Sequence, residues 1–391
     1  MHRKVLVPLL LLLAGCRSVP RVPEPALFPL TKKWVEPLDD PIQPPLATDG
    51  IRSFAAASDG IRAVEIATGT RSWLRSDITG TLSAMPGLVV VRSGSGLVTA
   101  LDPISGKTRW SVRTPRPSTL PAAFDGARVL LAGTRLVALD ATTGKTLLDE
   151  ALVAPAVATP VVAGGYLLVA EADAALRCYA ATTLRLQWFF PTGRPLEAAP
   201  AVDGGLVVVG TADRRALALN LENGKKEWTF KIGATVQVAP TITRRLALVA
   251  SNEAILYAFG RGNGHVSWIA PLPSRPLGPP IVVGSKVFIA CHADELLGFD
   301  LATGEPSGST HAGVETLDPA LGASEVRAAP VVVPPFVVVG LRNPWAMVAL
   351  EPGAPPAKPS PPPPFPPDEA DALVVTVAPA PAAVPSAPPN P

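Results

Sequence analysis

The stretch ALDPISGKTRW, residues 100–110, decides the fold because versions of it recur along the chain. The other copies are AVEIATGTRSW, ALDATTGKTLL, CYAATTLRLQW, ALNLENGKKEW, AFGRGNGHVSW and GFDLATGEPSG, ending at Trp73, Leu148, Trp188, Trp228, Trp268 and Gly308. Their shared turn position falls at Gly69, Gly106, Gly144, Leu184, Gly224, Gly264 and Gly304, in steps of 37 to 40 residues. A nearly constant period of this length predicts a repeat architecture.

The residues of the phrase have physical roles in a tight turn between two strands. The Asp102 side chain can accept hydrogen bonds from backbone N–H groups of the turn, and Gly106 can take the positive φ that closes it. Trp110 can bury its ring between neighbouring sheets while its indole N–H finds a carbonyl. The predicted structural residues of the repeat are Trp34, Trp73, Trp110, Trp188, Trp228 and Trp268, with Gly69, Gly106, Gly144, Gly224, Gly264 and Gly304.

Each copy also carries two apolar runs ahead of the phrase. Residues 200–210, PAVDGGLVVVG, are typical: a proline opens the first run, where its missing N–H costs no ladder bond. The unit is therefore predicted to hold four short strands separated by turn residues. Units of about 40 residues with four antiparallel strands are blades of a β-propeller. Valine runs, 32 Gly and 47 Pro exclude the helical repeats of similar period.

The last copy is incomplete and the first segment of the chain supplies what it lacks. Residues 327–340 provide two strands and residues 346–353 a third, but no closing strand with a Trp follows. Residues 31–35, TKKWV, have the sequence of such a closing strand. We therefore predict an all-β, eight-bladed propeller over residues 31–353, its ring closed by the strand around Trp34, which leaves no free sheet edge.

The first residues are a targeting signal. Charged residues 2–4 precede an apolar run at residues 5–13, which is far short of the roughly 20 residues that span a bilayer. The following LAGC resembles the lipobox of bacterial lipoproteins, which implies cleavage before Cys16 and its acylation, a palmitate chain included. Residues 1–15 are the expected signal peptide and residues 16–30 a lipidated linker. By resemblance to the sorting rule of enteric lipoproteins, Arg17 in place of Asp favours the outer membrane, facing the periplasm.

The C-terminal residues 354–391 are dominated by Pro and Ala and cannot build a packed core. We expect a disordered tail that acts as a spacer, the alternative being a segment that binds an aromatic groove. Cys178 and Cys291 lie too far apart for a disulfide framework, and Cys178 stands where other copies have Ala, as a small core residue.

Composition and motifs indicate no catalytic, metal or cofactor site. A net charge of +2 gives no basic excess, so nucleic acid is not an expected partner. His265, His292 and His311 lack the spacing of a zinc site, and CHADE at residues 291–295 falls in a hairpin of the repeat.

The phrase ALDxxTGKxxW, with its preceding Pro, resembles the PQQ-like β-propeller repeat superfamily. A lipobox followed by eight blades further resembles the BamB family of outer-membrane assembly lipoproteins. That resemblance implies a non-enzymatic scaffold that contacts a BamA-like barrel-assembly subunit and assists unfolded outer-membrane proteins. In that family a loop with Leu and Arg between two central blades meets the partner. The equivalent residues 191–200, PTGRPLEAAP, make Arg194 and Leu196 the expected partner-binding residues.

Two other functions remain open at this point. The chain could be an independent propeller lipoprotein of the cell envelope that binds a peptide, glycan or small molecule in its central funnel. It could also be a quinoprotein dehydrogenase, a class that needs Ca²⁺ and a base near the quinone and commonly has an adjacent Cys pair. This chain has no adjacent Cys pair.

Overall fold

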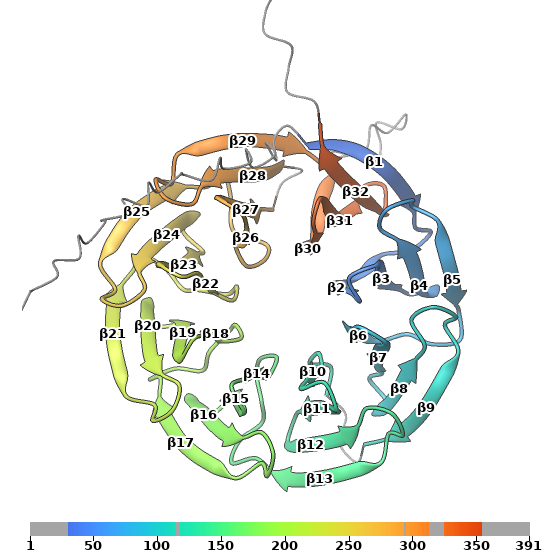
Figure 1. The fold of residues 1–391 in the computed structure, drawn as a ribbon, viewed down its shortest axis with the longest axis horizontal. Coiled ribbons are helices and arrows are strands. Elements are labelled where there is room, and N and C mark those ends of the chain that lie inside the picture. The colour runs from blue at the N-terminus through green and yellow to red at the C-terminus, as the bar shows by residue number, and fades with distance from the viewer. Residues whose placement is uncertain (1–29, 115–117, 293–294, 313–323, 354–391) are drawn as a thin grey trace, which may run out of the picture. The chain divides into compact units, whose positions relative to one another are not determined.

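The computed structural model describes residues 30–114, 118–292, 295–312 and 324–353, and in them all regular structure is β. The strands form eight four-stranded antiparallel sheets, which stand as blades around a central axis (Figure 1). The predicted all-β, eight-bladed propeller is thereby confirmed. Cys16, the signal peptide, the linker before Leu30 and the Pro/Ala-rich tail lie outside the described residues. The chain divides after Ala354, and its second unit is Pro355–Pro391.

The blades follow one another along the chain, and each of the first seven uses four consecutive strands. Blades 1 to 4 consist of β2 (Ile42–Thr48), β3 (Arg52–Ala57), β4 (Gly60–Glu65) and β5 (Arg71–Arg75); β6 (Thr81–Met85), β7 (Leu88–Arg92), β8 (Leu97–Leu101) and β9 (Thr108–Arg113); β10 (Ala123–Phe124), β11 (Arg128–Ala132), β12 (Arg135–Asp140) and β13 (Thr146–Ala151); β14 (Val161–Ala163), β15 (Tyr166–Glu171), β16 (Ala175–Ala180) and β17 (Leu186–Pro191). Blades 5 to 8 consist of β18 (Ala201–Asp203), β19 (Leu206–Thr211), β20 (Arg215–Asn220) and β21 (Lys226–Lys231); β22 (Thr241–Ile242), β23 (Leu246–Ser251), β24 (Ile255–Gly260) and β25 (Val266–Pro271); β26 (Ile281–Val283), β27 (Lys286–Ala290), β28 (Glu295–Asp300) and β29 (Pro306–His311); β30 (Glu325–Val333), β31 (Phe336–Arg342), β32 (Ala346–Pro352) and β1 (Leu30–Pro37).

Burial changes from the inside of a blade to its outside. The second strand of blade 5, β19, is buried at every residue because both faces of its sheet pack against neighbouring blades. The outermost strand, β21, buries Trp228 between exposed neighbours. Prolines directly precede the innermost strands β14, β18, β22 and β26, as the sequence predicted.

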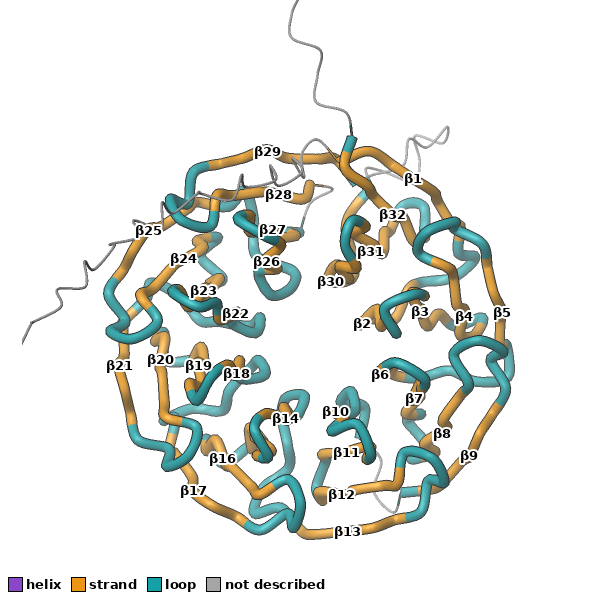
Figure 2. The backbone as a smooth tube through the Cα atoms, in the orientation of Figure 1, coloured by secondary structure: helices purple, strands orange, loops and turns teal. Residues whose placement is uncertain are grey.

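Loops join the strands within each blade and link successive blades (Figure 2), and they lie on two different rims of the ring. Because successive strands of a blade are antiparallel, the turns after its first and third strands lie on one rim, which we name the turn face. The turns after its second strands and the links between blades lie on the other rim, the connection face. The recurring ALDxxTGK turns therefore all lie on the turn face.

The first strand of the chain closes the ring. β1 pairs antiparallel with β32, from Leu30 opposite Pro352 to Pro37 opposite Ala346. Just beyond the pair, the Leu38 amide donates to the Trp345 carbonyl at 2.9 Å. The predicted closure by the strand around Trp34 is confirmed, and a hydrophobic cluster then joins blade 8 to blade 1.

Candidate functional site

The recurring tryptophans and glycines contact each other across blade boundaries. The Trp188 ring of blade 4 lies against Gly224 in the third turn of blade 5, and a Cβ added at Gly224 would meet that ring at 2.6 Å. The Trp188 Nε1–H donates to the Leu221 carbonyl of the same turn at 2.8 Å. Gly224 also has a φ of +67°, which favours glycine. Both the backbone conformation and the Trp188 ring therefore disfavour a side chain at this position. The same contact joins Trp34 to Gly69, Trp73 to Gly106, Trp110 to Gly144, Trp228 to Gly264 and Trp268 to Gly304.

Two boundaries between blades lack this contact, each for a visible reason. Blade 3 has Leu148 in place of Trp, and the facing turn of blade 4 has Leu184 in place of Gly. Leu184 keeps a positive φ of +56°, is buried and shares a hydrophobic cluster with Leu148. Blade 7 has Gly308, and the facing blade 8 has no third turn because its third strand ends at Pro352.

The turn aspartates are engaged in holding the turns. Asp102 Oδ1 accepts the amide hydrogens of Ile104 and Ser105 at 3.0 and 2.9 Å, and its other oxygen binds Arg109 at 2.6 Å. The hydrogen bond that Arg109 donates to Asp102, followed by the one that the Ser105 amide donates, holds the pKa of Asp102 well below its usual range. The Asp, Gly and Trp of the phrase thus build turns and contacts between blades.

The link between blades 4 and 5 is the expected partner-binding segment, and it lies on the connection face. Thr192 is buried and pins the link, since its amide and its hydroxyl both lie 2.8 Å from the Ala174 carbonyl. Arg194 is exposed two residues later. In the part of the chain that the structure describes, its guanidinium has no hydrogen-bonding partner.

Leu196 has a different role from the one predicted. Only 2% of it is exposed, and it packs in the core with Trp188 and Leu217 between blades 4 and 5. The expectation that it contacts a partner is therefore corrected: Leu196 anchors the link, whereas Arg194, like Glu197, is exposed. A signal was present in the sequence, because Val236 stands one period of 40 residues later and is fully buried.

The surroundings of Arg194 carry charges of both signs, and Glu197 of the same link is also exposed. The link lies over the hairpin between β19 and β20, where Arg214 is exposed and Arg215 pairs with Asp213. A side chain at Gly193 would stand 3.7 Å from the Arg215 guanidinium. Arg194 and Arg214 are therefore exposed cations at this part of the connection face, beside the paired Arg215 and Asp213.

The described residues contain no cluster of three or more His, Cys, Asp or Glu that could hold a metal ion. Cys178 and Cys291 are both buried, and burial raises the pKa of their thiols to about 12 and about 11. A reactive cysteine has a lowered pKa, so neither thiol has the environment of a nucleophile. No helix in this part of the chain is long and apolar enough to cross a membrane.

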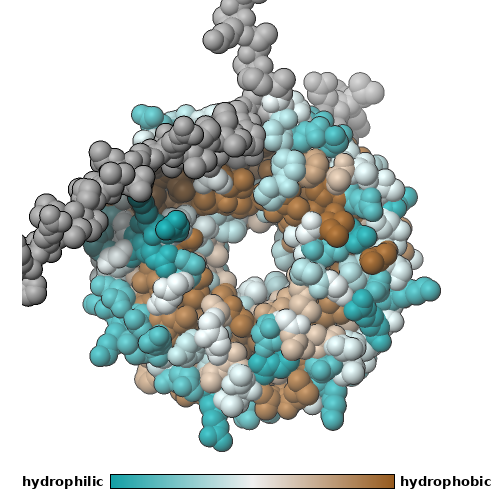
Figure 3. Space-filling view, viewed as in Figure 1, coloured by the Kyte–Doolittle hydropathy of each residue, from teal (hydrophilic) through white to brown (hydrophobic). Residues whose placement is uncertain are grey.

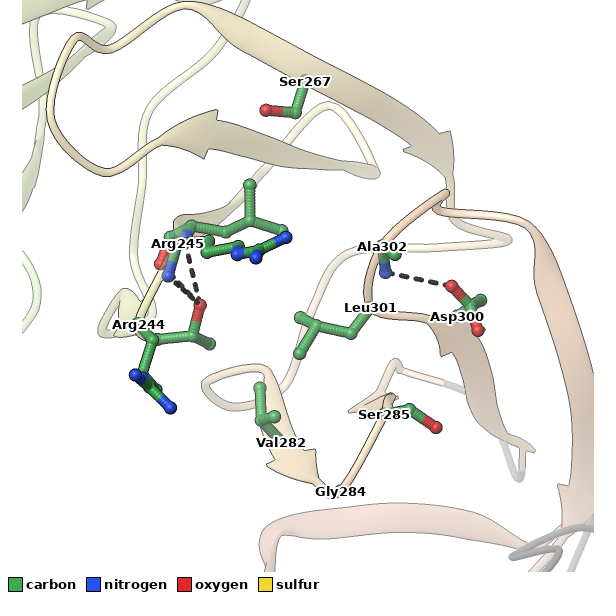
Figure 4. A pocket seen from close by; sticks show the side chains of 11 residues that line it. Arg244, Arg245, Ser267, Val282, Gly284, Ser285, Asp300, Leu301 and Ala302 are labelled. Carbon is green, nitrogen blue, oxygen red and sulfur yellow. Dashed lines mark hydrogen bonds between the residues drawn. The ribbon is translucent and has the colours of Figure 1, made fainter. Parts of the chain in front are cut away.

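Sequence reasoning missed a groove on the turn face between blades 6 and 7 (Figure 4). Arg244 and Arg245 line it, in a turn where most blades have glycine. The signal was that departure from the repeat.

Eight four-stranded blades, built from a Trp and Gly repeat and closed by an N-terminal strand, define an eight-bladed PQQ-like β-propeller. A family model described as outer membrane protein assembly factor BamB matches residues 31–119, 94–194 and 185–340. The chain belongs to this BamB family.

Two solved structures share the fold. The crystal structure of BamB from Moraxella catarrhalis is 18% identical, covers 82% of this chain and 97% of its own, and has a TM-score of 0.66. The crystal structure of the computationally designed Ika8 protein is 17% identical, with 80% and 97% coverage and a TM-score of 0.68. At these identities the likeness concerns the fold alone. A search of curated protein sequences finds no match.

Proposed function

We propose that the chain is a non-enzymatic, membrane-anchored periplasmic scaffold that supports the assembly of outer-membrane β-barrel proteins. Its partner would be a BamA-like barrel-assembly subunit, with unfolded outer-membrane proteins as further clients. The observation that carries the proposal is the family match, which runs through the ring from residue 31 to residue 340. The geometry supports it, since the repeated Trp rings pack against the turn glycines of the next blade and the turn Asp side chain accepts backbone hydrogen bonds.

The anchor would be lipid on Cys16, at the end of a linker that reaches the ring at Leu30. Leu30 begins β1 on the turn face, because β1 runs antiparallel to a third strand that ends there. The tether would therefore arrive at the turn face and leave the connection face open to a partner. The lipobox and Arg17 support an outer-membrane location that faces the periplasm.

The segment that we propose to meet the partner is the link at Arg194. It joins two central blades, and its exposed Arg194 lies between the buried Thr192 and Leu196 and near the exposed Arg214. An acidic surface on the partner would be the complementary chemistry.

An independent ligand-binding propeller is the second candidate, favoured by two hollows. The ring has an opening along its axis with apolar surface around it (Figure 3). The groove between blades 6 and 7 has a volume of about 740 Å³, within the range of ligand pockets.

Recovery of partners tests the proposal. The lipidated protein is captured from detergent-solubilised envelope and its companions are identified by mass spectrometry, with the Cys16→Ser protein as a control for the anchor. We expect a BamA-like subunit with the wild-type protein. Recovery of the propeller without such a subunit, while the bait is intact, would contradict the scaffold and favour the ligand-binding alternative.

A further inference from the structure

A groove on the turn face between blades 6 and 7, which we name the 6/7 groove, lies among three turns (Figure 4). The first hairpin of blade 6 supplies residues 243–246, and blade 7 supplies Gly284 in its first turn and Leu301 in its third. The volume of about 740 Å³ is that of a small-molecule site. The chemistry of the lining residues therefore decides which molecule the groove can take.

Two arginines of the 6/7 groove carry uncompensated charge. Arg244 and Arg245 are exposed, and neither guanidinium has a hydrogen bond or an ion pair with any residue that the structure describes. Arg245 extends across the groove toward Leu301, whereas Arg244 points away from it (Figure 4). The first turns of blades 4 and 5 carry glycines at these positions, at residues 164–165 and 204–205. The cations are therefore not part of the repeat.

Asp300, the acidic residue of the lining, is already engaged. Its carboxylate pairs with Lys286 at 3.1 Å and accepts the amide hydrogens of Ala302 and Thr303 at 2.9 and 3.2 Å. The hydrogen bond from Lys286 lowers the pKa of Asp300, so the carboxylate stays ionised and paired at neutral pH. The Arg245 guanidinium is therefore left to bind an anion from outside the described chain.

The turn that carries the arginines is fixed by hydrogen bonds. The Thr243 hydroxyl oxygen accepts the Leu246 amide hydrogen at 2.9 Å, and the Thr243 amide donates to the Leu246 carbonyl at 2.7 Å. The Arg261 guanidinium donates to the Thr243 carbonyl at 2.9 Å. Because this turn is ordered beforehand, a ligand would not have to order its backbone on binding.

Apolar side chains stand beside the cations in the groove. Leu246, Val282 and Leu301 line it, and all three are only partly buried. They pack against one hydrophobic cluster that joins blades 6 and 7. A ligand that covers them would remove this apolar surface from water, which favours binding. The 6/7 groove thus offers apolar surface next to an unpaired guanidinium.

The boundary between blades 5 and 6 has different residues at the same positions. Arg261 stands one repeat before Leu301, and it pairs with Asp203 in the first turn of blade 5. Its guanidinium also donates to the Asp203 carbonyl at 2.7 Å. Blade 7 has Leu301 in place of this Arg, and blade 6 has Thr243 in place of this Asp. These two positions therefore form no ion pair across the 6/7 groove.

The lining determines which class of ligand fits. We propose that the 6/7 groove binds a small organic anion with an apolar body. The acid group pairs with the Arg245 guanidinium, and the apolar body covers Leu246, Val282 and Leu301. This site is independent of the scaffold proposed above, because the link at Arg194 lies on the connection face.

Dye binding to the full-length chain tests the proposal. The probes are anilinonaphthalene sulfonate, an apolar anion whose fluorescence rises on binding, and phenylnaphthylamine, the same ring system without the sulfonate. The Cys16→Ser protein keeps the full chain and removes the need for detergent, whose micelles would bind both dyes. We expect saturable binding of the sulfonate, about tenfold tighter than that of the neutral dye. Equal affinities for the two dyes, or no saturable binding, would overturn the proposal.

Charge reversal locates the bound anion. Arg245→Glu should weaken sulfonate binding about tenfold or more and leave the affinity for the neutral dye within about twofold. Arg244→Glu is the matched control, because it makes the same charge change on the neighbouring side chain, which points away from Leu301. It should weaken sulfonate binding by less than about threefold. An unchanged affinity in Arg245→Glu, or equal losses in both variants, would contradict a contact at Arg245.

A second variant introduces the ion pair of the preceding boundary. Thr243→Asp with Leu301→Arg copies Asp203 and Arg261, and should abolish saturable binding of both dyes while the Tm stays close to that of the wild type. Wild-type binding by this variant, once folded, would place the dyes elsewhere and overturn the proposal. Sedimentation of dimers that exclude the sulfonate would assign the groove to a second copy of the chain and would also overturn it.

Discussion

The boundary between blades 4 and 5 and the boundary between blades 3 and 4 solve the same packing problem in opposite ways. At the first, the Trp188 ring covers Gly224 and leaves no room for a Cβ. At the second, Leu148 stands in place of the Trp and packs in one hydrophobic cluster with the buried Leu184, which stands in place of the Gly. The Trp and the Gly are therefore two halves of one contact, and the chain changes both or neither.

Two separate constraints can require glycine in the third turn of a blade, namely the positive φ and the facing Trp ring. Leu184 holds a φ of +56° although it is not glycine, so the backbone conformation alone does not demand glycine in this turn. A left-handed conformation costs an ordinary residue roughly 1–2 kcal/mol, which burial of a leucine can offset. At Gly224 the facing ring is the second and decisive reason.

The largest expected effect comes from breaking the Trp188 contact from the glycine side. Gly224→Leu should lower the free energy of unfolding by about 3–5 kcal/mol, through overpacking against the ring and the positive φ. Adding Trp188→Leu, which reproduces the arrangement of Leu148 and Leu184, should recover about 2 kcal/mol. Urea denaturation of both single variants and the double variant measures this coupling.

The matched control for that cycle is Gly205→Leu. Gly205 has a φ of +82° but nothing lies within 4 Å of the position that a Cβ would take. It should cost only the backbone strain, about 1–2 kcal/mol. If Gly205→Leu and Gly224→Leu are equally destabilising, or the double variant is simply additive, the ring contact is not what demands glycine.

The converse substitution sharpens the comparison from the other boundary. Leu184→Gly supplies the repeat residue but opposite no tryptophan, so it should leave a space beside Leu148. We expect a loss of about 2 kcal/mol, since the lost burial exceeds the relief of backbone strain. Thermal unfolding measures it, and an unchanged or raised Tm would show that Leu184 does not fill that boundary.

The smallest expected effect concerns the turns rather than the rings. Hydrogen bonds lower the pKa of Asp102, so its contribution to stability is present above its unfolded pKa of about 3.9 and is lost as pH falls below that value. Asp102→Asn should therefore cost about 1 kcal/mol at pH 7, and the difference from wild type should shrink below about pH 4. Denaturant midpoints from pH 7 to pH 3 measure this, and a difference that stays constant with pH would contradict the assignment.

The ring was predictable from sequence because its signals are periodic. The Trp, the turn Gly and the strand-opening Pro recur at one spacing, and the missing fourth strand of blade 8 appears as an unmatched Trp34 at the other end of the chain. At each of these residues the local turn preference and the packing between blades favour the same structure. Either of the two signals therefore predicts the same fold.

Features that depend on sequence differences between copies of the repeat were harder to predict. Leu196 was predicted to bind a partner because the link between blades 4 and 5 was considered by itself. Val236 occupies the same position one repeat later and is buried, which indicates that Leu196 is buried as well. The groove on the turn face between blades 6 and 7 is lined by Leu301, where the previous blade has the bridging Arg261. Whether such a change opens a space depends on side chains of two blades, and no single segment of sequence contains that information.

The most direct test of the scaffold uses one surface charge on the connection face. Arg194→Glu reverses the charge of the exposed Arg194, in the link between blades 4 and 5, without changing the buried Thr192 or Leu196. The control is Arg275→Glu, in a second Arg-Pro-Leu sequence that links blades 6 and 7 and is also exposed. Affinity for the recovered BamA-like subunit and the Tm are measured for both variants.

The account predicts that Arg194→Glu weakens binding about tenfold or more, that Arg275→Glu binds as wild type, and that both melt like the wild-type protein. Unaltered binding by Arg194→Glu, with full recovery of the partner, would contradict the assignment of this link as the contact surface.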